Sequence, residues 1–340
     1  MPRTLSLLFL MLVCVACGEA APELPDATPI RVAGRTSVAV ASVTPALPAA
    51  TETPSPAATP TPVPTTRPAA TPSPTSTPFR FAVIGDFGQA GTPEADVAAL
   101  VQSWRPDFIV TTGDNNYPNG KAETIDANIG QYYADYIFPY YGGYTRTTAL
   151  EVNRFFPVPG NHDDDNEAGL QPYLAYFTLP GNERYYEVVW PPVHLFALNS
   201  NGNEPDGFRL DSAQAAWLQE RLAASTMPWR LVILHVAPYS SGFHGSNGAR
   251  QWPFQEWGAS AVLAGHDHLY ERLLVDGLPY FVNGLGGYPA IYAFEEILPE
   301  SQARYREDYG AMRVEATDTT ITFEFISREG DIIDSYKLTK

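Results

Sequence analysis

The chain of 340 residues carries 38 acidic and 21 basic side chains, which gives a formal net charge of −17 at pH 7. No region resembles a basic patch, so we expect no nucleic-acid-binding surface. The two cysteines, Cys14 and Cys17, lie near the N-terminus, and the rest of the chain has neither a disulfide nor a thiol nucleophile. Such an acidic protein can still act on phosphates when bound metal ions supply positive charge.

The first 17 residues are predicted to be a lipoprotein-type signal peptide. Residues 5–16, LSLLFLMLVCVA, form an apolar run behind Arg3 that is too short for a confident membrane span. The sequence CVAC at 14–17 resembles a bacterial lipobox with Cys17 lipidated, although Cys14 stands where that pattern prefers leucine. Simple cleavage after a small-x-small sequence is the alternative. We therefore expect export, with a lipid anchor on Cys17 at the outside of the cell membrane or else secretion.

Residues 18–78 are predicted to be a disordered stalk rich in proline and threonine. Of the 32 prolines, 15 lie in residues 1–78, a segment with almost no aromatic residues with which to build a core. Residues 79–340 have the length and composition of one domain with a large core. The whole net charge falls on this domain, because residues 1–78 carry four basic and four acidic side chains.

Strands and helices alternate along the predicted domain. Short apolar runs predict buried strands at 79–85, 107–112, 154–159, 193–198 and 230–235. Helical patterns fall between them, at about 93–104, 124–138 and 211–224. Near the C-terminus, GAMRVEATDTTITFEFIS alternates with period two and predicts an antiparallel hairpin that turns at TDTT. The fold class is therefore α/β with a mixed or antiparallel C-terminal portion.

Polar clusters follow nearly every predicted strand. They are GDFG at 85–88, GDNNY at 113–117, GNHD at 160–163, VILH at 232–235 and GHDH at 265–268. The carboxyl ends of strands in α/β sheets are where ligands bind, so these clusters suggest one shared site. A single aspartate at a strand end is more often a helix cap, but a set of oxygen and nitrogen donors without cysteine fits Zn, Mn or Fe.

In this order, the five blocks resemble the metallophosphoesterases of the calcineurin-like superfamily. The resemblance implies a four-layer αββα sandwich of two mixed β-sheets flanked by helices, with residues 79–340 as the catalytic domain. Most of that superfamily has Asp-x-His in the first block, where this chain has Gly88. Purple acid phosphatases instead have GDxG followed by GDxxY, and Tyr117 stands at that tyrosine. The sequence is thus most similar to the small, tartrate-resistant type of purple acid phosphatase.

The resemblance implies two metal ions, carried over residue by residue. The first, expected to be Fe(III), would be held by Asp86, Asp114, Tyr117 and His268. The second, expected to be Fe, Zn or Mn, would be held by Asp114, Asn161, His235 and His266. Phenolate and carboxylate oxygens suit a hard trivalent ion, and imidazole and amide suit a divalent one. Two such ions can clamp a phosphate and hold the attacking hydroxide, so no serine or cysteine is needed.

Two further histidines are candidate catalytic residues. Relatives carry histidines at the positions of His162, beside Asn161, and of His244, nine residues after His235, and these would serve the leaving group. The alternatives are a hydrogen-bond donor to a carboxylate for His162 and an ordinary loop residue for His244. His194, inside the apolar run VHLFAL, is expected to be a satisfied core or edge histidine.

Two stretches remain open. QYYADYIFPYYGGY at 131–144 could form a wall for aromatic substrates, although packing of a helix and its loop is favoured. The glycines of NGLGGYP at 283–289 either allow the backbone to approach the site or form a tight turn.

The sequence predicts an exported, acid phosphatase-like enzyme that acts on small phosphomonoesters. A phosphodiesterase or a nucleotide-hydrolysing relative with the same metals is the alternative among enzymes. From another class, the chain could be a surface lipoprotein that binds metal or phosphate without turnover.

Overall fold

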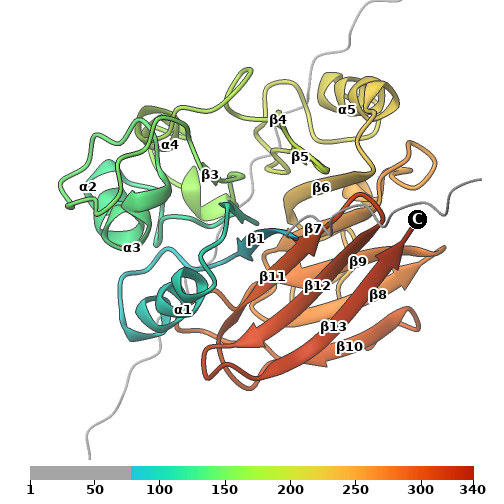
Figure 1. The fold of residues 1–340 in the computed structure, drawn as a ribbon. Coiled ribbons are helices and arrows are strands. Elements are labelled where there is room, and N and C mark those ends of the chain that lie inside the picture. Colours follow the sequence, from blue (N-terminus) through green and yellow to red (C-terminus); the bar gives the residue numbers. More distant parts are fainter. Residues whose placement is uncertain (1–77) are drawn as a thin grey trace, which may run out of the picture. The chain divides into compact units, whose positions relative to one another are not determined.

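The computed structural model describes residues 78–340, which form two mixed β-sheets flanked by helices (Figure 1). The predicted signal peptide, the lipidation of Cys17 and the stalk lie outside the described residues. Within residues 78–340, no helix has both the length and the apolar character needed to cross a membrane.

The first sheet has six strands and joins the start of the domain to its end. Its order is β13 (Ile332–Thr339), β12 (Thr320–Ser327), β11 (Gly310–Ala316), β1 (Phe79–Ile84), β2 (Phe108–Thr111) and β3 (Phe155–Phe156). Strands β1, β2 and β3 are parallel, whereas β11 is antiparallel to β1. The predicted hairpin is confirmed, because β11 and β12 pair antiparallel from Gly310 with Ser327 to Ala316 with Ile321.

The second sheet has seven strands around a parallel centre. Its order is β10 (Ser301–Tyr305), β8 (Tyr270–Val275), β9 (Leu278–Asn283), β7 (Ala261–Gly265), β6 (Trp229–Val236), β5 (Val193–Ala197) and β4 (Tyr186–Trp190). Strands β5, β6, β7 and β9 are parallel to their neighbours in this group, and β4, β8 and β10 pair antiparallel at the two sides. The continuous apolar runs of β5 and β7 reflect burial on both faces.

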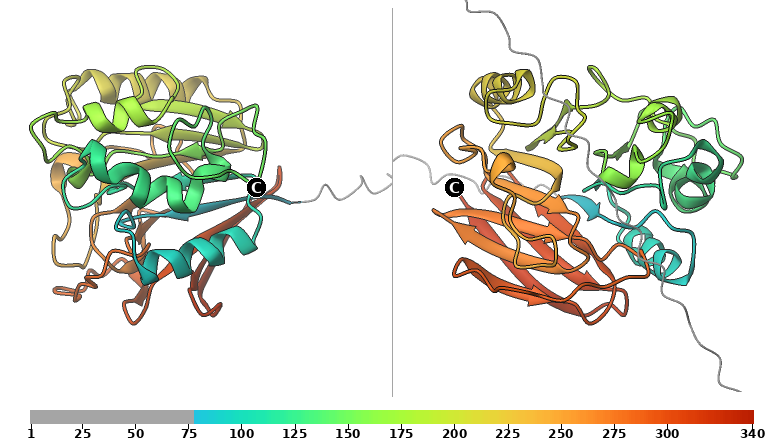
Figure 2. Two further views of the ribbon diagram at one scale, coloured as in Figure 1. Left: turned by 90° about the vertical axis from the view of Figure 1, so that its left-hand side faces the viewer. Right: turned by 180° about the vertical axis from the view of Figure 1, so that it is seen from behind.

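Helices cover the outer sides of the two sheets. Helix α1 (Thr92–Ser103) adds Val97, Ala98 and Val101 to the apolar cluster that also holds the buried residues of β1, β2 and β11. Helix α5 (Ala213–Ala224) begins at Ser212, whose hydroxyl accepts a hydrogen bond from Ala215 N, and packs on the other face of β5 to β7. Figures 1 and 2 show α1 in cyan beside the first sheet and α5 in yellow beyond the second.

Two predicted elements differ in detail from the structure. The strand predicted at 154–159 is only two residues long, since Pro157 and Pro159 cannot donate to a ladder. The helix predicted at 124–138 is a series of short pieces: α2 (Ala122–Ile125), a π-helical turn (Asp126–Gly130), α3 (Gln131–Tyr133) and a 3₁₀ turn (Ala134–Tyr136). Gly130 within the run and Pro139 after it explain why no regular helix extends through this segment. A fourth helix, α4, spans Gln171–Tyr176.

Candidate metal centre

The loops that follow four of the parallel strands converge at one edge of the sandwich. Asp86 follows β1, Asp114 follows β2, and the 3₁₀ turn Asn161–Asp163 comes after β3. From the second sheet, His235 lies near the end of β6, and His266 and His268 follow β7. Because parallel strands present their carboxyl ends at the same edge, residues up to 182 positions apart along the chain come into contact.

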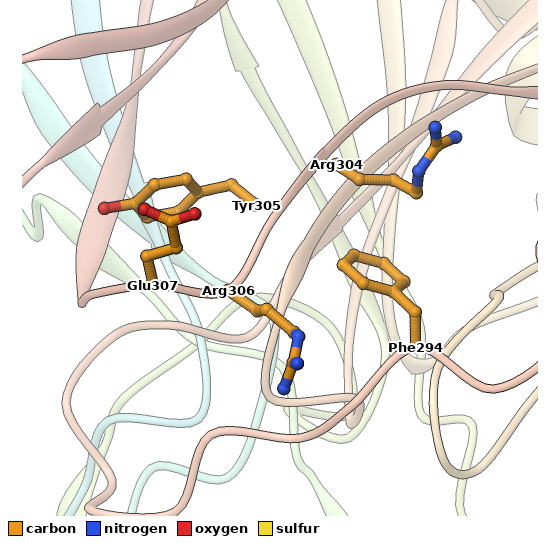
Figure 3. Close-up of a pocket in the computed structure, with 5 residues that line it drawn as sticks. All are labelled: Phe294, Arg304, Tyr305, Arg306 and Glu307. Atoms are coloured by element: carbon orange, nitrogen blue, oxygen red, sulfur yellow. The ribbon is translucent and has the colours of Figure 1, made fainter.

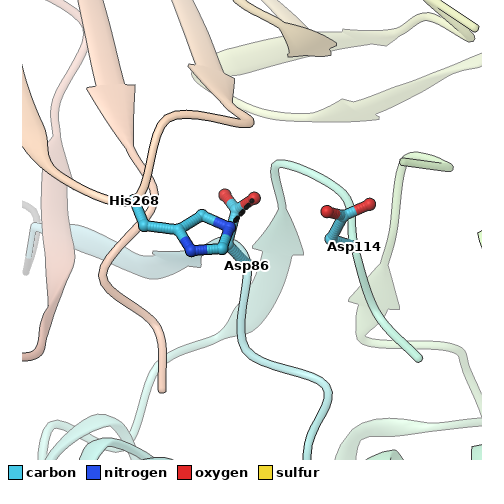
Figure 4. Close-up of side chains that lie close together, drawn as sticks. All are labelled: Asp86, Asp114 and His268. Atoms are coloured by element: carbon cyan, nitrogen blue, oxygen red, sulfur yellow. Dashed lines mark ion pairs between the residues drawn. The ribbon is translucent and has the colours of Figure 1, made fainter. Parts of the chain in front are cut away.

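The first group of converging side chains contains Asp86, Asp114, Tyr117 and His268. Tyr117 O–H donates to Asp114 Oδ2 at 2.8 Å, and the Tyr117 hydroxyl oxygen lies 3.1 Å from His268 Nε2. His268 Nε2 is 3.5 Å from Asp86 Oδ1, the ion pair drawn in Figure 4. The ligand atoms of Asp86, Asp114 and His268 all lie within 4.8 Å of one another, and all three residues are buried. This separation suits a single metal ion.

The second group contains Asn161, His235 and His266. His235 Nε2 lies 2.9 Å from Asn161 Oδ1 and 3.2 Å from His266 Nδ1. Asp114 Oδ1 is 3.4 Å from the same His235 nitrogen. The two oxygens of Asp114 thus face different groups, Oδ2 toward Tyr117 and Oδ1 toward His235. One carboxylate between two donor sets is the arrangement that a bridging ligand requires.

Three of these residues hold a left-handed backbone conformation that is uncommon outside glycine. The φ angles are 54° for Asp86, 53° for Asp114 and 73° for His266. Each lies within three residues of the end of a strand, and the amide of His266 donates to both Asp86 oxygens at 3.1 and 3.0 Å. Non-glycine residues in this region cost of order 1 kcal/mol or more each and cluster at functional sites. The strain therefore marks these three positions as candidates for function.

A close contact between the first and second loops brings Tyr117 into the site. Gly88 N donates to Asp114 O at 3.3 Å, and Tyr117 N donates to Gly88 O at 2.7 Å. A Cβ atom at Gly88 would lie 1.8 Å from Asn115 O, so no larger residue fits there without a shift of the backbone. The close approach of the two loops thus leaves no room for a histidine at position 88, and the same approach places Tyr117 in the site.

Backbone carbonyls orient three of the histidine rings. Nδ1 of His235 lies 2.9 Å from Thr112 O, Nδ1 of His268 lies 2.8 Å from Ala290 O, and Nδ1 of His162 lies 2.6 Å from Pro118 O. A carbonyl only accepts, so Nδ1 carries the proton in each case. Nε2 of His235 and of His268 is then directed at the two donor groups, as in histidine ligands fixed by an outer hydrogen bond.

The charge of the centre fits bound cations. Asp86 and Asp114 are at most 1% exposed, and no arginine or lysine within residues 78–340 pairs with either carboxylate. Two buried carboxylates without an arginine or lysine partner are costly, and metal ions are the usual compensation. Burial, and then neighbouring histidines, lower the pKa of His266 to about 2, which keeps it neutral as a ligand must be. Burial and the charge of Asp114 raise the pKa of Tyr117, so its phenol stays protonated until a cation replaces the proton.

The two candidate catalytic histidines lie at the edge of this centre. His162 N donates to Asp114 Oδ1 at 2.9 Å, and its ring centroid is 4.5 Å from that of Tyr117. The ring of His244 stacks on that of His266 at 3.9 Å. Both are more exposed than the residues of the first group. They lie where a group bound at the centre would meet solvent.

Residues within the same blocks that the sequence did not single out support these side chains. Buried Asp163 accepts from Asn115 N at 3.1 Å and from Gly160 N at 2.7 Å, which ties the second loop to the third. Burial, and then Asp114, raise the pKa of Asp163 to about 7. Asp267 accepts from His244 N at 2.8 Å and from the Ser240 hydroxyl at 2.6 Å. The only sequence signal for these two roles was an acidic residue two positions after Asn161 and another directly after His266.

Aromatic rings from the loop after β9 also line the centre. Tyr288 stacks on Tyr117 with centroids 3.9 Å apart, and Tyr292 stacks on His268 at 4.2 Å. Gly286 N donates to Gly85 O at 2.8 Å, and Tyr288 N donates to Asp86 O at 3.0 Å. The glycines of NGLGGYP thus allow the backbone to approach the first loop. Of the two interpretations offered from the sequence, this supports approach to the site over a tight turn.

The remaining candidates have structural roles. His194 is 5% exposed on β5, an inner strand between β6 and β4, with Nδ1 2.8 Å from Ser225 Oγ and Nε2 3.2 Å from Glu187, so it is a core histidine away from the metal centre. In the tyrosine-rich stretch, Tyr133 and Tyr136 are buried and Tyr140 O–H donates to Asp126 at 2.7 Å, which supports packing.

Two cavities lie apart from the predicted site residues, none of which lines either of them. One has a volume of about 410 Å³ and lies around Phe294 and Arg304 (Figure 3), and the other has a volume of about 810 Å³ and lies around Asn119 and Asp165.

Several known proteins with similar sequences are acid phosphatases. Residues 79–270 match the family described as Calcineurin-like phosphoesterase. Tartrate-resistant acid phosphatase type 5 of Mus musculus is 25% identical over 305 residues, which cover 76% of this chain and 89% of that protein. Purple acid phosphatase 17 of Arabidopsis thaliana is 25% identical over 293 residues, which cover 76% of this chain and 84% of that protein.

Among solved structures, the fold is similar to that of purple acid phosphatase PPD1 from yellow lupin (Lupinus luteus) seeds, with a TM-score of 0.63 and 17% identity. The match covers 78% of this chain and 54% of the lupin chain, so this chain spans about half the length of that protein. The likeness concerns the fold, and it confirms the predicted sandwich of two mixed sheets flanked by helices.

Proposed function

This chain belongs to the calcineurin-like phosphoesterase family, and from that premise we propose that it is a dinuclear-metal hydrolase of phosphomonoesters. The observation that carries the proposal is the position of Asp114, whose two oxygens lie 2.8 Å from Tyr117 and 3.4 Å from His235. A site for one ion would not need a second donor set on the other side of the same carboxylate. The acid phosphatases among its relatives support the choice of phosphomonoesters.

Each donor set matches one metal ion in its chemistry. Asp86, Asp114, Tyr117 and His268 would hold the first, which we propose to be Fe(III), because a phenolate and two carboxylates favour a hard trivalent ion. Asp114, Asn161, His235 and His266 would hold the second, Fe, Zn or Mn. When bound, the two ions would polarise the phosphate and lower the pKa of water at the site.

The histidines outside the two donor sets would act on the substrate. The Nδ1–H of His162 is engaged by Pro118 O, so Nε2 is its free nitrogen for a phosphate oxygen or a leaving group. His244 is held by the hydrogen bond from its amide to Asp267 and by its stack on His266. A positioned donor near the leaving oxygen stabilises the charge that develops as the ester bond breaks.

An assay with metal analysis tests the proposal. The full chain, loaded with iron alone or with iron and zinc, should hydrolyse a monoester faster than a diester or pyrophosphate, with two metal ions bound per chain. Faster cleavage of the diester would assign the protein as a phosphodiesterase. Two bound metal ions without turnover of any ester would assign it as a binding protein.

The proposed location is the outside of the cell. The signal at 1–17, the stalk at 18–78 and the catalytic domain at 79–340 together form an exported enzyme, held to the membrane through lipidated Cys17 or else secreted. Its proposed partners are small phosphate esters. The acidic composition supports the expectation that no nucleic acid is bound.

A further inference from the structure

Phe243 is an exposed aromatic residue in a loop that is otherwise firmly held. Its side chain is 64% exposed, while Ser241 and Gly242 beside it are buried. The Ser241 hydroxyl donates to Glu271 at 2.6 Å, and Gly242 forms a bridge with Phe294. A single exposed apolar residue is ordinary by itself. What distinguishes Phe243 is the position in which this anchored loop holds it.

The ring of Phe243 lies one residue away from both donor sets. Its centroid is 5.1 Å from that of His244, which stacks on His266 at 3.9 Å. It is also 5.6 Å from the centroid of Tyr292, which stacks on His268 at 4.2 Å. Ring contacts therefore lead from the exposed face of Phe243 to a proposed ligand of each metal ion, through His244 to His266 and through Tyr292 to His268.

We propose that Phe243, together with Tyr292, forms a leaving-group subsite that selects aryl phosphomonoesters; this inference rests on the proposed function. The leaving oxygen must come within reach of a proton donor, and His244 is next to Phe243 in the chain and in space. An aromatic group on that oxygen then meets the Phe243 ring. Aromatic rings attract each other at centroid separations of about 4.5–7 Å, a range in which Phe243 already contacts its neighbours.

The competing direction for the leaving group is the other side of His162. There, a cavity of about 810 Å³ is lined by Asn119, Lys121, Glu123 and Asp165, among others. Its lining includes three acidic residues and contains no aromatic ring for stacking. A leaving group on that side would make the reaction insensitive to Phe243.

Kinetics of Phe243 variants in the full, metal-loaded chain test the inference. For Phe243→Ala, kcat/KM for phenyl phosphate should fall about three- to ten-fold while kcat/KM for ethyl phosphate stays within error. The loss should appear in KM, because stacking stabilises bound substrate and transition state alike. Phe243→Tyr should restore the aryl preference, and Phe243→Leu should restore only part of it. Tyr141→Ala, which removes an aromatic side chain that is 81% exposed in a different loop, is the matched control.

Binding of substrate analogues gives a readout that needs no turnover. In benzylphosphonate and propylphosphonate, a methylene replaces the ester oxygen of phenyl phosphate and of ethyl phosphate. Benzylphosphonate should bind more tightly than propylphosphonate, and Phe243→Ala should reduce this ratio of affinities by the same three- to ten-fold, as measured by calorimetry (about the stacking energy of one ring pair). Equal losses for aryl and alkyl compounds would mean that Phe243 only supports the loop, and unchanged ratios would place the leaving group elsewhere. Either outcome overturns the subsite while leaving the phosphatase intact. A metal-loaded wild type that cleaves no monoester would overturn the proposed function as well.

Discussion

The backbone amide of Tyr117 donates to the carbonyl of Gly88 at 2.7 Å, so the residue that brings a phenol into the centre is fixed by the residue that lacks a side chain. Gly88 occupies the position at which a histidine would otherwise enter. Its missing Cβ allows the first loop to lie against Asn115 O, and that approach places the Tyr117 hydroxyl 2.8 Å from Asp114. Gly88 and Tyr117 thus form a pair: the glycine replaces the histidine, and the tyrosine supplies the side chain that enters the centre.

Replacing Tyr117 by phenylalanine should separate metal ligation from packing. If the phenolate binds Fe(III), the oxidised wild type should be purple from ligand-to-metal charge transfer, and Tyr117→Phe should lose the visible band and much of its trivalent iron. The fold should persist, since the ring still packs against Tyr288. Absorption spectra with iron analysis of the same samples make the measurement. An iron-loaded wild type without the band, or a variant that keeps it, would leave only the broader phosphoesterase assignment.

A side chain at position 88 should disrupt the centre even when it is a metal-binding one. Overpacking costs about 1–3 kcal/mol, and a Cβ at Gly88 would lie 1.8 Å from Asn115 O, so Gly88→Ala and Gly88→His should both lower the free energy of unfolding and the iron content. Combining Gly88→His with Tyr117→Phe should not restore iron binding. Gly248→Ala is the control, because a Cβ there meets nothing within 4 Å. Full iron content in the double variant would refute the argument.

His162→Ala should slow the reaction without removing the metals. Loss of one positioned donor typically costs about 10²-fold or more in kcat, and His162 lies outside both donor sets. The effect should be largest for alkyl phosphates, whose leaving groups need the most help. Steady-state kinetics and metal content measured on the same preparation check this prediction. An unchanged kcat for a poor leaving group would remove His162 from the mechanism.

Buried Glu94 should make the protein less stable as pH rises. It is 0% exposed, and neither of its carboxylate oxygens has a hydrogen-bond partner within residues 78–340, so burial raises its pKa well above the ordinary value. The folded state therefore keeps the proton while the unfolded chain ionises above about pH 4.3. The stability from this group is full below the unfolded pKa and declines as pH rises toward the folded pKa.

Glu94→Gln removes this ionisation and tests the pH dependence. Its free energy of unfolding relative to wild type should increase between pH 4 and pH 7, by about 1 kcal/mol or more, as measured in urea with the metals removed. The exposed Glu296→Gln serves as the control. A difference between variant and wild type that is equal at both pH values would show that Glu94 is ionised in the folded protein.

Cys17 should determine whether the protein is attached to the membrane or released. Two or more acyl chains hold a protein firmly to a membrane, whereas one chain binds only marginally. Expressed with its signal in a bacterial host, the wild type should fractionate with membranes and Cys17→Ser should not. Equal release of both into the soluble fraction would favour simple secretion.

The strand and helix patterns of the sequence predicted most of the fold. Alternating burial in β11 and β12 and unbroken burial in β5 and β7 follow directly from the spacing of apolar residues. The sequence pattern was less reliable at 124–138 and 154–159, where tertiary packing and prolines shorten or interrupt the elements. The pairing of β1 with β11 joins segments more than 200 residues apart, which no local pattern specifies.

Residue types and their places at strand ends, both visible in the sequence, determined which side chains could serve the centre. The family resemblance proposed how they divide between two ions, but only the tertiary structure supplies their separations, because a distance such as the 3.4 Å from Asp114 to His235 depends on how two sheets pack. The same holds for Phe243, Tyr292 and Glu94, whose exposure, stacking and burial arise from segments distant in sequence. Local sequence fixes chemistry and strand direction, whereas contacts across layers depend on the packing of the whole domain.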